Sequence, residues 1–168
     1  TGKQFGLEIT TEVDERYNVE KATEAACKYF LSAYKTLGNW TLVAASYNMG
    51  IAGVKNEIEK QQVSSYYELY LKEEPFRYVF RLLAIKEIFE HPGRYGLKYL
   101  GKHLYYPIPY NKVEVKTSIP NLITWAKQQG ITYKVLKEFN SWLRAEKLTN
   151  TTGKSYFIII PNIKDMVI

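Results

Sequence analysis

The chain has 168 residues, of which 46% are apolar, enough for one packed domain or for part of a domain and a small module. One cysteine excludes a disulfide framework, and two separated histidines give no metal-site spacing, so we expect no metal. The net charge of +6 and the 15 tyrosines suit nucleic acid in principle. The basic residues are dispersed and form no nucleic-acid-binding signature, however, so nucleic acid is not an expected partner.

The first predicted element is an amphipathic helix between Asn18, a typical N-cap residue, and Gly38, a typical helix stop. Its apolar residues recur at helical spacing, at Ala22, Ala26, Tyr29, Phe30, Ala33, Tyr34 and Leu37. Cys27 is interpreted as a core position of the same pattern, which predicts a buried and inert thiol.

Two further helices are predicted at residues 40–48 and 54–60, with a Tyr47-Asn48 pair and two glycines, Gly50 and Gly53, at their junction. Glycine permits backbone angles that a side chain would forbid, and it allows close approach of a ligand. A tyrosine face beside a carboxamide suits an N-acetylated sugar, because the ring covers the apolar face and the amide pairs with the acetamide. The alternative is a tyrosine packed in the core beside an ordinary helix stop.

A long fourth helix is predicted from Glu74 to the Pro92-Gly93 pair, with Glu73 and Glu74 as acidic residues of its first turn. Its apolar stripe consists of Phe76, Val79, Phe80, Leu83 and Phe89. Tyr78 lies one position off this stripe, where its hydroxyl can reach a neighbouring carboxyl or bond to backbone or water. Three tyrosines that precede the helix are interpreted as packing residues, with sugar stacking as the secondary alternative: Tyr66, Tyr67 and Tyr70.

Residues 92–112 are rich in Pro, Gly and Tyr, which predicts a connector whose aromatic rings wrap onto a nearby surface. Beyond it the predicted order is strand, helix, helix, strand. The strands are at residues 113–115 and 156–161, and the helices are at 118–129 and 132–140. Trp142 is either a core residue or a ring that stacks on a sugar.

Three segments resemble, in order, motifs of the soluble-lytic-transglycosylase family. Residues 13–16, Val-Asp-Glu-Arg, and the helix after them resemble a passage of its membrane-bound lytic murein transglycosylase D branch. Residues 43–54 resemble the AYNAG motif, and residues 74–79 resemble the E-T-x-x-Y-V motif, with Pro75 in place of threonine. The pattern L-x-x-W-A-x-x-x-G-I at residues 122–131 resembles a LysM module, although the loop at 142–153 is long and Lys-Thr-Ser replaces the usual turn at 116–118. The resemblance leaves a glycan-binding and a packing role for this module equally open.

The resemblance implies a catalytic glutamate upstream of residues 1–7, so we expect a piece of a longer protein that is inactive alone. In the family that glutamate acts first as acid and then as base, while the sugar's own 6-hydroxyl attacks to give a 1,6-anhydromuramic product. Tyr47 and Asn48 are then expected to contact the N-acetylated sugar, Gly50 to allow its close approach, and Tyr78 to orient the glutamate.

The expected fold is mainly α: a partial lysozyme-like helical domain at residues 1–91, a connector at 92–112, and a small α+β (βααβ) LysM-like module at 113–168. The expected parent protein is a peptidoglycan lytic transglycosylase that cleaves the MurNAc–GlcNAc β-1,4 bond. On this interpretation no cofactor is expected. A non-catalytic peptidoglycan-binding or scaffold protein is the alternative. The resemblance also implies peptidoglycan glycan strands as partner and a location in the periplasm or at the outer membrane, with room for a membrane anchor on the parent. Truncation would expose apolar surface, which predicts self-association.

Overall fold

The computed structural model describes residues 1–162, which fall into two compact units. The helical unit comprises residues 27–104, and the module unit comprises residues 1–26 together with the chain from residue 105 onwards. The mainly α fold with a small α+β module is confirmed. The predicted domain limits at residues 91 and 112 stay predictions, and residues 163–168 of the predicted module lie outside the described residues.

Four α-helices occur between residues 19 and 90, close to the predicted positions. They are α1 (Val19–Leu37), α2 (Trp40–Met49), α3 (Ile51–Gln61) and α4 (Glu73–Glu90). The Asn18 side chain accepts a hydrogen bond from the N–H of Lys21 at 3.1 Å, and Gly38 has a φ of +66°, so both predicted ends of α1 are confirmed. Asn39 caps α2 by accepting hydrogen bonds from the N–H groups of the second and third helical residues.

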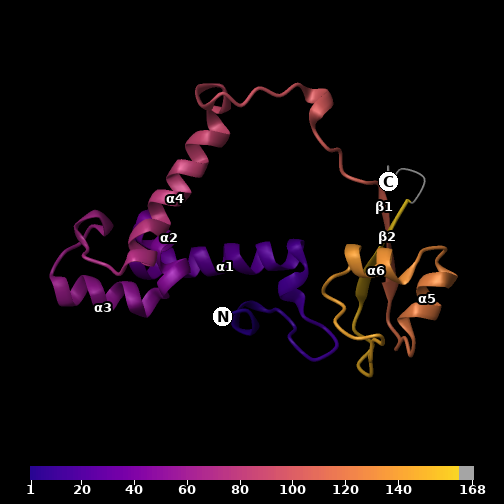
Figure 1. Ribbon diagram of the computed structural model, residues 1–168. Coiled ribbons are helices and arrows are strands. Elements are labelled where there is room, and N and C mark those ends of the chain that lie inside the picture. Colours follow the sequence, from indigo (N-terminus) through magenta and orange to yellow (C-terminus); the bar gives the residue numbers. More distant parts are fainter. Residues whose placement is uncertain (163–168) are drawn as a thin grey trace. The chain divides into compact units, whose positions relative to one another are not determined.

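The core of the helical unit lies where α2, α3 and α4 meet (Figure 1). Its buried residues are Leu42, Ala45, Val54, Tyr66, Leu69 and Val79. The Tyr66 hydroxyl donates to the carbonyl oxygens of Pro75 and Phe76 at 2.9 and 2.6 Å, so Tyr66 packs as predicted. Tyr67 is 61% exposed but packs at the edge of the core, with its ring centroid 5.6 Å from that of Tyr66 and 6.1 Å from that of Phe80. The packing interpretation is wrong for Tyr70, which is 90% exposed.

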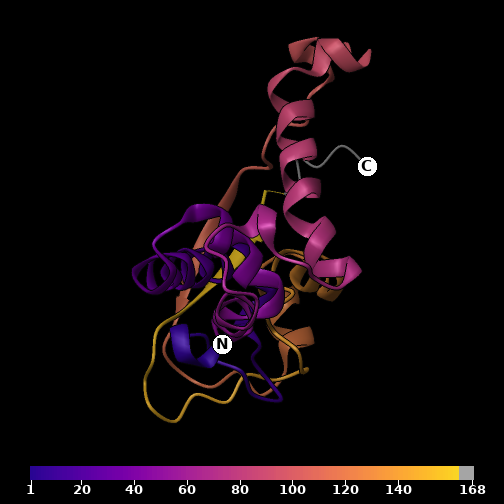
Figure 2. The ribbon, with the colours of Figure 1, turned by 90° about the vertical axis from the view of Figure 1, so that its left-hand side faces the viewer.

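The apolar stripe of α4 is mostly uncovered in the described residues. Val79 is buried, whereas Phe76, Phe80 and Leu83 are 45–48% exposed and Phe89 is 78% exposed. Figure 2 shows the carboxyl-terminal half of α4 projecting beyond the helices against which its first turns pack. The helix was therefore predicted correctly, but most of its stripe is not a core face.

Two other expectations of burial are wrong. Cys27 is exposed, because the buried side of α1 runs through Ala25, Tyr29 and Ala33, and Cys27 lies on the far side of that line.

The connector tyrosines do not wrap onto a surface. Each is at least 43% exposed, and Tyr105 is fully so. The segment contains a 3₁₀ turn at Pro92–Tyr95, where Arg94 pairs with Glu87 at 3.0 Å, and its last residues enter β1.

The module unit has the predicted βααβ order. Strand β1 (Tyr110–Val115) pairs antiparallel with β2 (Tyr156–Pro161), and α5 (Leu122–Gln128) and α6 (Tyr133–Phe139) lie between them in the chain (Figure 1). Helix α5 begins later than predicted, because the Asn121 side chain caps it by accepting from the N–H of Thr124 at 2.8 Å. Trp142 is a core residue, 4% exposed, and its ring stacks on that of Tyr156 with 5.9 Å between the ring centroids.

Residues 12–14 belong to the packing of this module. Val13 is 2% exposed and lies in the module's core cluster, where it forms a β-bridge with Leu143. The N–H of Asp14 donates to the carbonyl of Trp142 at 2.8 Å, and the Glu12 carbonyl accepts from the N–H of Arg144 at 2.7 Å. Backbone bonds thus attach the amino-terminal segment to the loop that follows α6. Within residues 1–162, the helices are too short or too polar to cross a membrane.

Candidate functional site

Tyr47, Asn48 and Gly50 lie at the junction of α2 and α3. The Tyr47 side chain is 52% exposed, and Asn48 is exposed beside it. Gly50 joins the two helices with φ +80° and ψ 154°, a conformation that favours glycine, and its N–H donates to the Ser46 carbonyl at 2.7 Å. A Cβ built on Gly50 would meet no atom within 4 Å, so the backbone is open to approach at this point.

The Tyr47 ring is held by two aromatic residues of α1. Its centroid lies 5.7 Å from that of Tyr29 in an edge-to-face arrangement, and 5.0 Å from that of Phe30. Tyr29 is in turn fixed through its hydroxyl, which donates to the Ser46 carbonyl at 2.6 Å. Tyr47 is therefore an exposed ring with a packed base, the arrangement in which an aromatic side chain offers a free face at little cost in entropy.

Tyr78 of α4 lies close enough to Tyr47 of α2 for the two phenols to interact electrostatically. Burial raises the pKa of the half-buried Tyr78 phenol, and the neighbouring Tyr47 phenol raises it further. The structure thus brings together the predicted site residues of α2 and α4. Neither effect on Tyr78 comes from a carboxylate.

Gly53 does not share the special conformation of Gly50. It lies inside α3 with ordinary helical backbone, and a Cβ there would be 3.5 Å from the end of the Met49 side chain, an ordinary contact. Gly53 was expected at the junction before a helix at residues 54–60, and the structure places it inside α3 instead.

A buried carboxylate network in the module unit escaped sequence reasoning. Glu15 is 2% exposed, and its carboxylate accepts from the N–H of Glu8 at 2.7 Å and from the ammonium group of Lys21. Lys154 lies 3.6 Å from Glu15 and also pairs with Glu8. The Tyr156 hydroxyl donates to both oxygens of the Glu8 carboxylate at 3.0 Å. Lys154 and Tyr156 are far from Glu8 and Glu15 in sequence, so no local pattern marks these two partners.

The network changes the acid–base behaviour of its members. Burial by itself would raise the pKa of Glu15, but the Glu8 N–H and the Lys21 ammonium outweigh it, and the pKa is lowered from 4.5. Burial and the hydrogen bond to Glu8 raise the pKa of Tyr156 to about 12. Each carboxylate is matched by donors, which is the chemistry of a structural ion pair and not of a proton-donating acid.

One group of candidate metal ligands occurs among the described residues, at the end of α4. The ligand atoms of Glu87, Glu90 and His91 lie within 4.8 Å of one another. Arg94 and His91 pair with Glu87 at 3.0 and 3.2 Å, and Lys86 pairs with Glu90 at 2.8 Å. The carboxylates are already engaged by cationic side chains, so we assign no metal site here.

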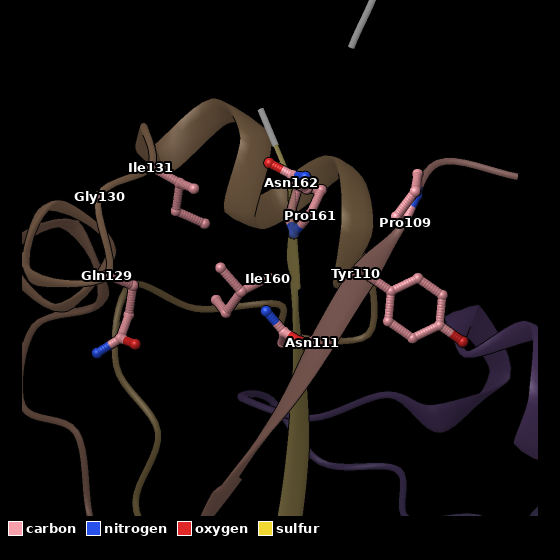
Figure 3. A pocket seen from close by; sticks show the side chains of 9 residues that line it. All are labelled: Pro109, Tyr110, Asn111, Gln129, Gly130, Ile131, Ile160, Pro161 and Asn162. Atoms are coloured by element: carbon pink, nitrogen blue, oxygen red, sulfur yellow. The ribbon is translucent and has the colours of Figure 1, made fainter. Parts of the chain in front are cut away.

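A shallow pocket of about 410 Å³ lies at one end of the β1–β2 pair. Its lining is formed by Pro109, Tyr110, Asn111, Gln129, Gly130, Ile131, Ile160, Pro161 and Asn162. In Figure 3, Ile131 and Ile160 face one another, whereas the Tyr110 ring points away from them. The lining contains no carboxylate, histidine or cysteine, so this pocket has no candidate for acid–base or nucleophilic chemistry.

Comparisons with known proteins agree with the sequence motifs. Residues 1–70 match the family described as "Transglycosylase SLT domain", and residues 111–164 match "Soluble lytic transglycosylase C-terminal LysM-like domain". Two curated relatives from Escherichia coli, of strains K12 and O6:H1, are each 27% identical over 173 aligned positions, 95% of this chain. Both carry the name "Membrane-bound lytic murein transglycosylase D". The chain spans about a third of the length of these relatives, 35% in each case.

Proposed function

Residues 1–70 and 111–164 belong to domains of the soluble lytic transglycosylase family, and from this we propose that the chain binds peptidoglycan glycan strands. The proposed binding site lies beside the bond that the parent protein cleaves. The observation that carries the proposal is the exposed Tyr47 ring, placed beside Asn48, Gly50 and Tyr78. The ring covers the apolar face of an N-acetylated sugar, the Asn48 carboxamide pairs with its acetamide, and the open backbone at Gly50 lets the sugar approach.

The proposed reaction is cleavage of the MurNAc–GlcNAc β-1,4 bond to a 1,6-anhydromuramic product. Protonation of the leaving oxygen requires a carboxylic acid with a raised pKa. The resemblance to the family, and not the electrostatics of Tyr78, supplies the reason to expect that this acid lies beyond the described residues, with Tyr78 placed to orient it. We assign the acid to a glutamate upstream of residue 1, as the family resemblance implies, and we expect this piece alone to be inactive.

The cell envelope is the proposed location, because the curated relatives are named as membrane-bound murein enzymes. We propose the periplasm or the outer membrane, with any membrane anchor on the parent protein. Self-association through the exposed stripe of α4 is part of the same proposal, since Phe76, Phe80 and Phe89 leave apolar surface open to water. Sedimentation of the chain across a range of concentrations tests this: a monomer at every concentration excludes self-association.

The decisive test is digestion of purified peptidoglycan by this chain and by a version extended upstream through the catalytic helix, with products identified by mass spectrometry. Anhydromuropeptides are expected from the extended form alone. Absence of these products from both forms, with Tyr47-dependent retention on insoluble peptidoglycan, identifies the second candidate, a non-catalytic peptidoglycan-binding or scaffold protein. What favours this second candidate is that, within residues 1–162, no carboxylate contributes to the raised pKa of Tyr78.

Binding is tested separately by co-sedimentation with insoluble peptidoglycan. Tyr47→Ala is expected to reduce retention about tenfold, as expected for loss of one well-placed aromatic contact of about 1.4 kcal/mol. Tyr105→Ala is the matched control, because it removes an equally large ring that is fully exposed and lies in the connector. Equal retention of the two variants contradicts the assignment of Tyr47.

A further inference from the structure

Four aromatic rings form a row along the seam between α1 and α2. Phe30 and Tyr34 are four residues apart and share one face of α1. Trp40 and Tyr47 are seven residues apart, close to two full turns, and share one face of α2. The rings pair across the seam between the two helices. The ring centroids of Phe30 and Tyr47 are 5.0 Å apart, and those of Tyr34 and Trp40 are 4.5 Å apart with 26° between the ring planes, a stacked arrangement.

The Tyr34–Trp40 end of the row is open to solvent and rigid. Trp40 is 56% exposed and Tyr34 is 39% exposed, so their stacking leaves a large part of both rings uncovered. Trp40 is the first residue of α2, where the Asn39 side chain fixes the backbone by accepting from the N–H of Thr41 at 2.8 Å. A stacked ring on a capped helix end is pre-organised, so a ligand that binds it loses little additional conformational entropy.

The spacing suits an extended glycan. Seven helical residues rise about 10 Å, so Trp40 lies farther from Tyr47 than one sugar ring extends. Aromatic faces with polar rims, Tyr hydroxyl and Trp N–H, match the alternation of apolar faces and hydroxyl edges along a chain of pyranose rings. The row is also continuous with Tyr47, the ring to which the proposed function assigns the first sugar.

We propose that the Tyr34–Trp40 pair is a second sugar-stacking platform, which holds the glycan strand at a point beyond the saccharide bound at Tyr47. The proposal rests on the proposed function, because it takes its occupant, a β-linked chain of N-acetylated hexosamines, from that function. The pair acts by binding and positioning, and it takes no part in bond cleavage. Short glycans reach only Tyr47, whereas longer ones engage both platforms.

The test is calorimetric titration of the full chain with the disaccharide and the hexasaccharide of β-1,4-linked N-acetylglucosamine. Trp40→Ala is expected to weaken binding of the hexasaccharide about five- to tenfold and to leave binding of the disaccharide unchanged. Trp40→Phe keeps a ring that stacks and should retain most of the affinity. Tyr47→Ala should weaken binding of both ligands, and Tyr105→Ala should weaken neither.

The outcomes separate this proposal from the proposed function. If the unaltered chain binds neither oligosaccharide, both proposals fail together. If it binds both and Trp40→Ala binds them equally well, or loses both to the same degree, only the second platform is refuted. Retention of the chain on anionic lipid vesicles that depends on Trp40, without any effect on oligosaccharide binding, would assign the pair to a membrane surface instead. Circular dichroism of each variant confirms that α1 and α2 remain folded.

Discussion

Glu15 offers the sharpest test of how the amino-terminal segment is held in the module unit. Its carboxylate is buried and accepts charge-assisted hydrogen bonds from the Glu8 N–H and from Lys21, with Lys154 nearby. Glu15→Gln keeps the shape of the side chain and removes the charge. Breaking a buried ion pair from one side costs about 3–5 kcal/mol.

The expected loss is smaller than that range. The side chains of Lys21 and Lys154 are 41% and 42% exposed, so both ammonium groups regain water when Glu15 is neutral. We therefore expect Glu15→Gln to lower the free energy of unfolding by about 2 kcal/mol at pH 7. Urea unfolding followed by tryptophan fluorescence measures this, because Trp125 and Trp142 report on the core of the module unit. The matched control is Glu20→Gln, which breaks an exposed ion pair with Lys112 in the same unit and should have no measurable effect.

The lowered pKa of Glu15 determines how its contribution to stability changes with pH. The pKa of Glu15 is lowered in the folded state, so its contribution is fully present above the unfolded value near 4.5 and is lost as pH falls through the folded pKa. The difference in stability between the unaltered chain and Glu15→Gln should therefore shrink as the solution is acidified below pH 4.5. A difference that stays constant from pH 7 down to strong acid, or one no larger than that of Glu20→Gln, refutes the reasoning.

Three further predictions concern single residues. Gly50→Ala should destabilise the helical unit by about 1–2 kcal/mol, because φ is +80°, whereas Gly53→Ala, in helical backbone, should be neutral or stabilising by up to about 1 kcal/mol; thermal unfolding compares them. Asn140→Ala should cost about 2–3 kcal/mol in urea unfolding, because this fully buried side chain makes three hydrogen bonds to backbone groups, and the N–H and carbonyl of Ile159 would lose it as partner. Tyr156→Phe should remove the tyrosine that ionises at about pH 12 from an ultraviolet titration. Because that folded pKa is raised above 10, the stability from its bond to Glu8 is present below pH 10 and is lost as pH rises through 12.

Local chemistry explains what the sequence predicted well. The ends of α1 depend on Asn18 and Gly38, whose preferences act within one helical turn, and β2 follows from an uninterrupted run of β-prone residues. Tyr47 and Gly50 could be identified from a helix stop, because the stop itself requires the positive φ at Gly50. These features need no knowledge of the rest of the fold.

What the sequence did not predict depends on partners that are distant along the chain. Glu15 lies 3.6 Å from Lys154, a residue near the other end of the chain, and no pattern near residue 15 indicates that partner. Cys27 was assigned to the core of α1, but Tyr29 and Ala33, which are buried members of the predicted stripe, lie on the opposite side of the helix from it. The connector tyrosines have the composition of packing residues, but composition does not provide a surface to pack against.

The β-bridge between Val13 and Leu143 limits how freely the LysM-like segment can be exchanged between proteins. A segment cut at residue 111 would leave out Val13 and, with it, one of the most deeply buried side chains of its own core. The same cut would strip the loop after α6 of its backbone partners at residues 12 and 14. The LysM-like segment alone therefore does not contain its complete core. A chimaera that exchanges this segment must carry residues 7–17 from the same parent. Otherwise both the amino-terminal segment and the loop after α6 have to be redesigned together.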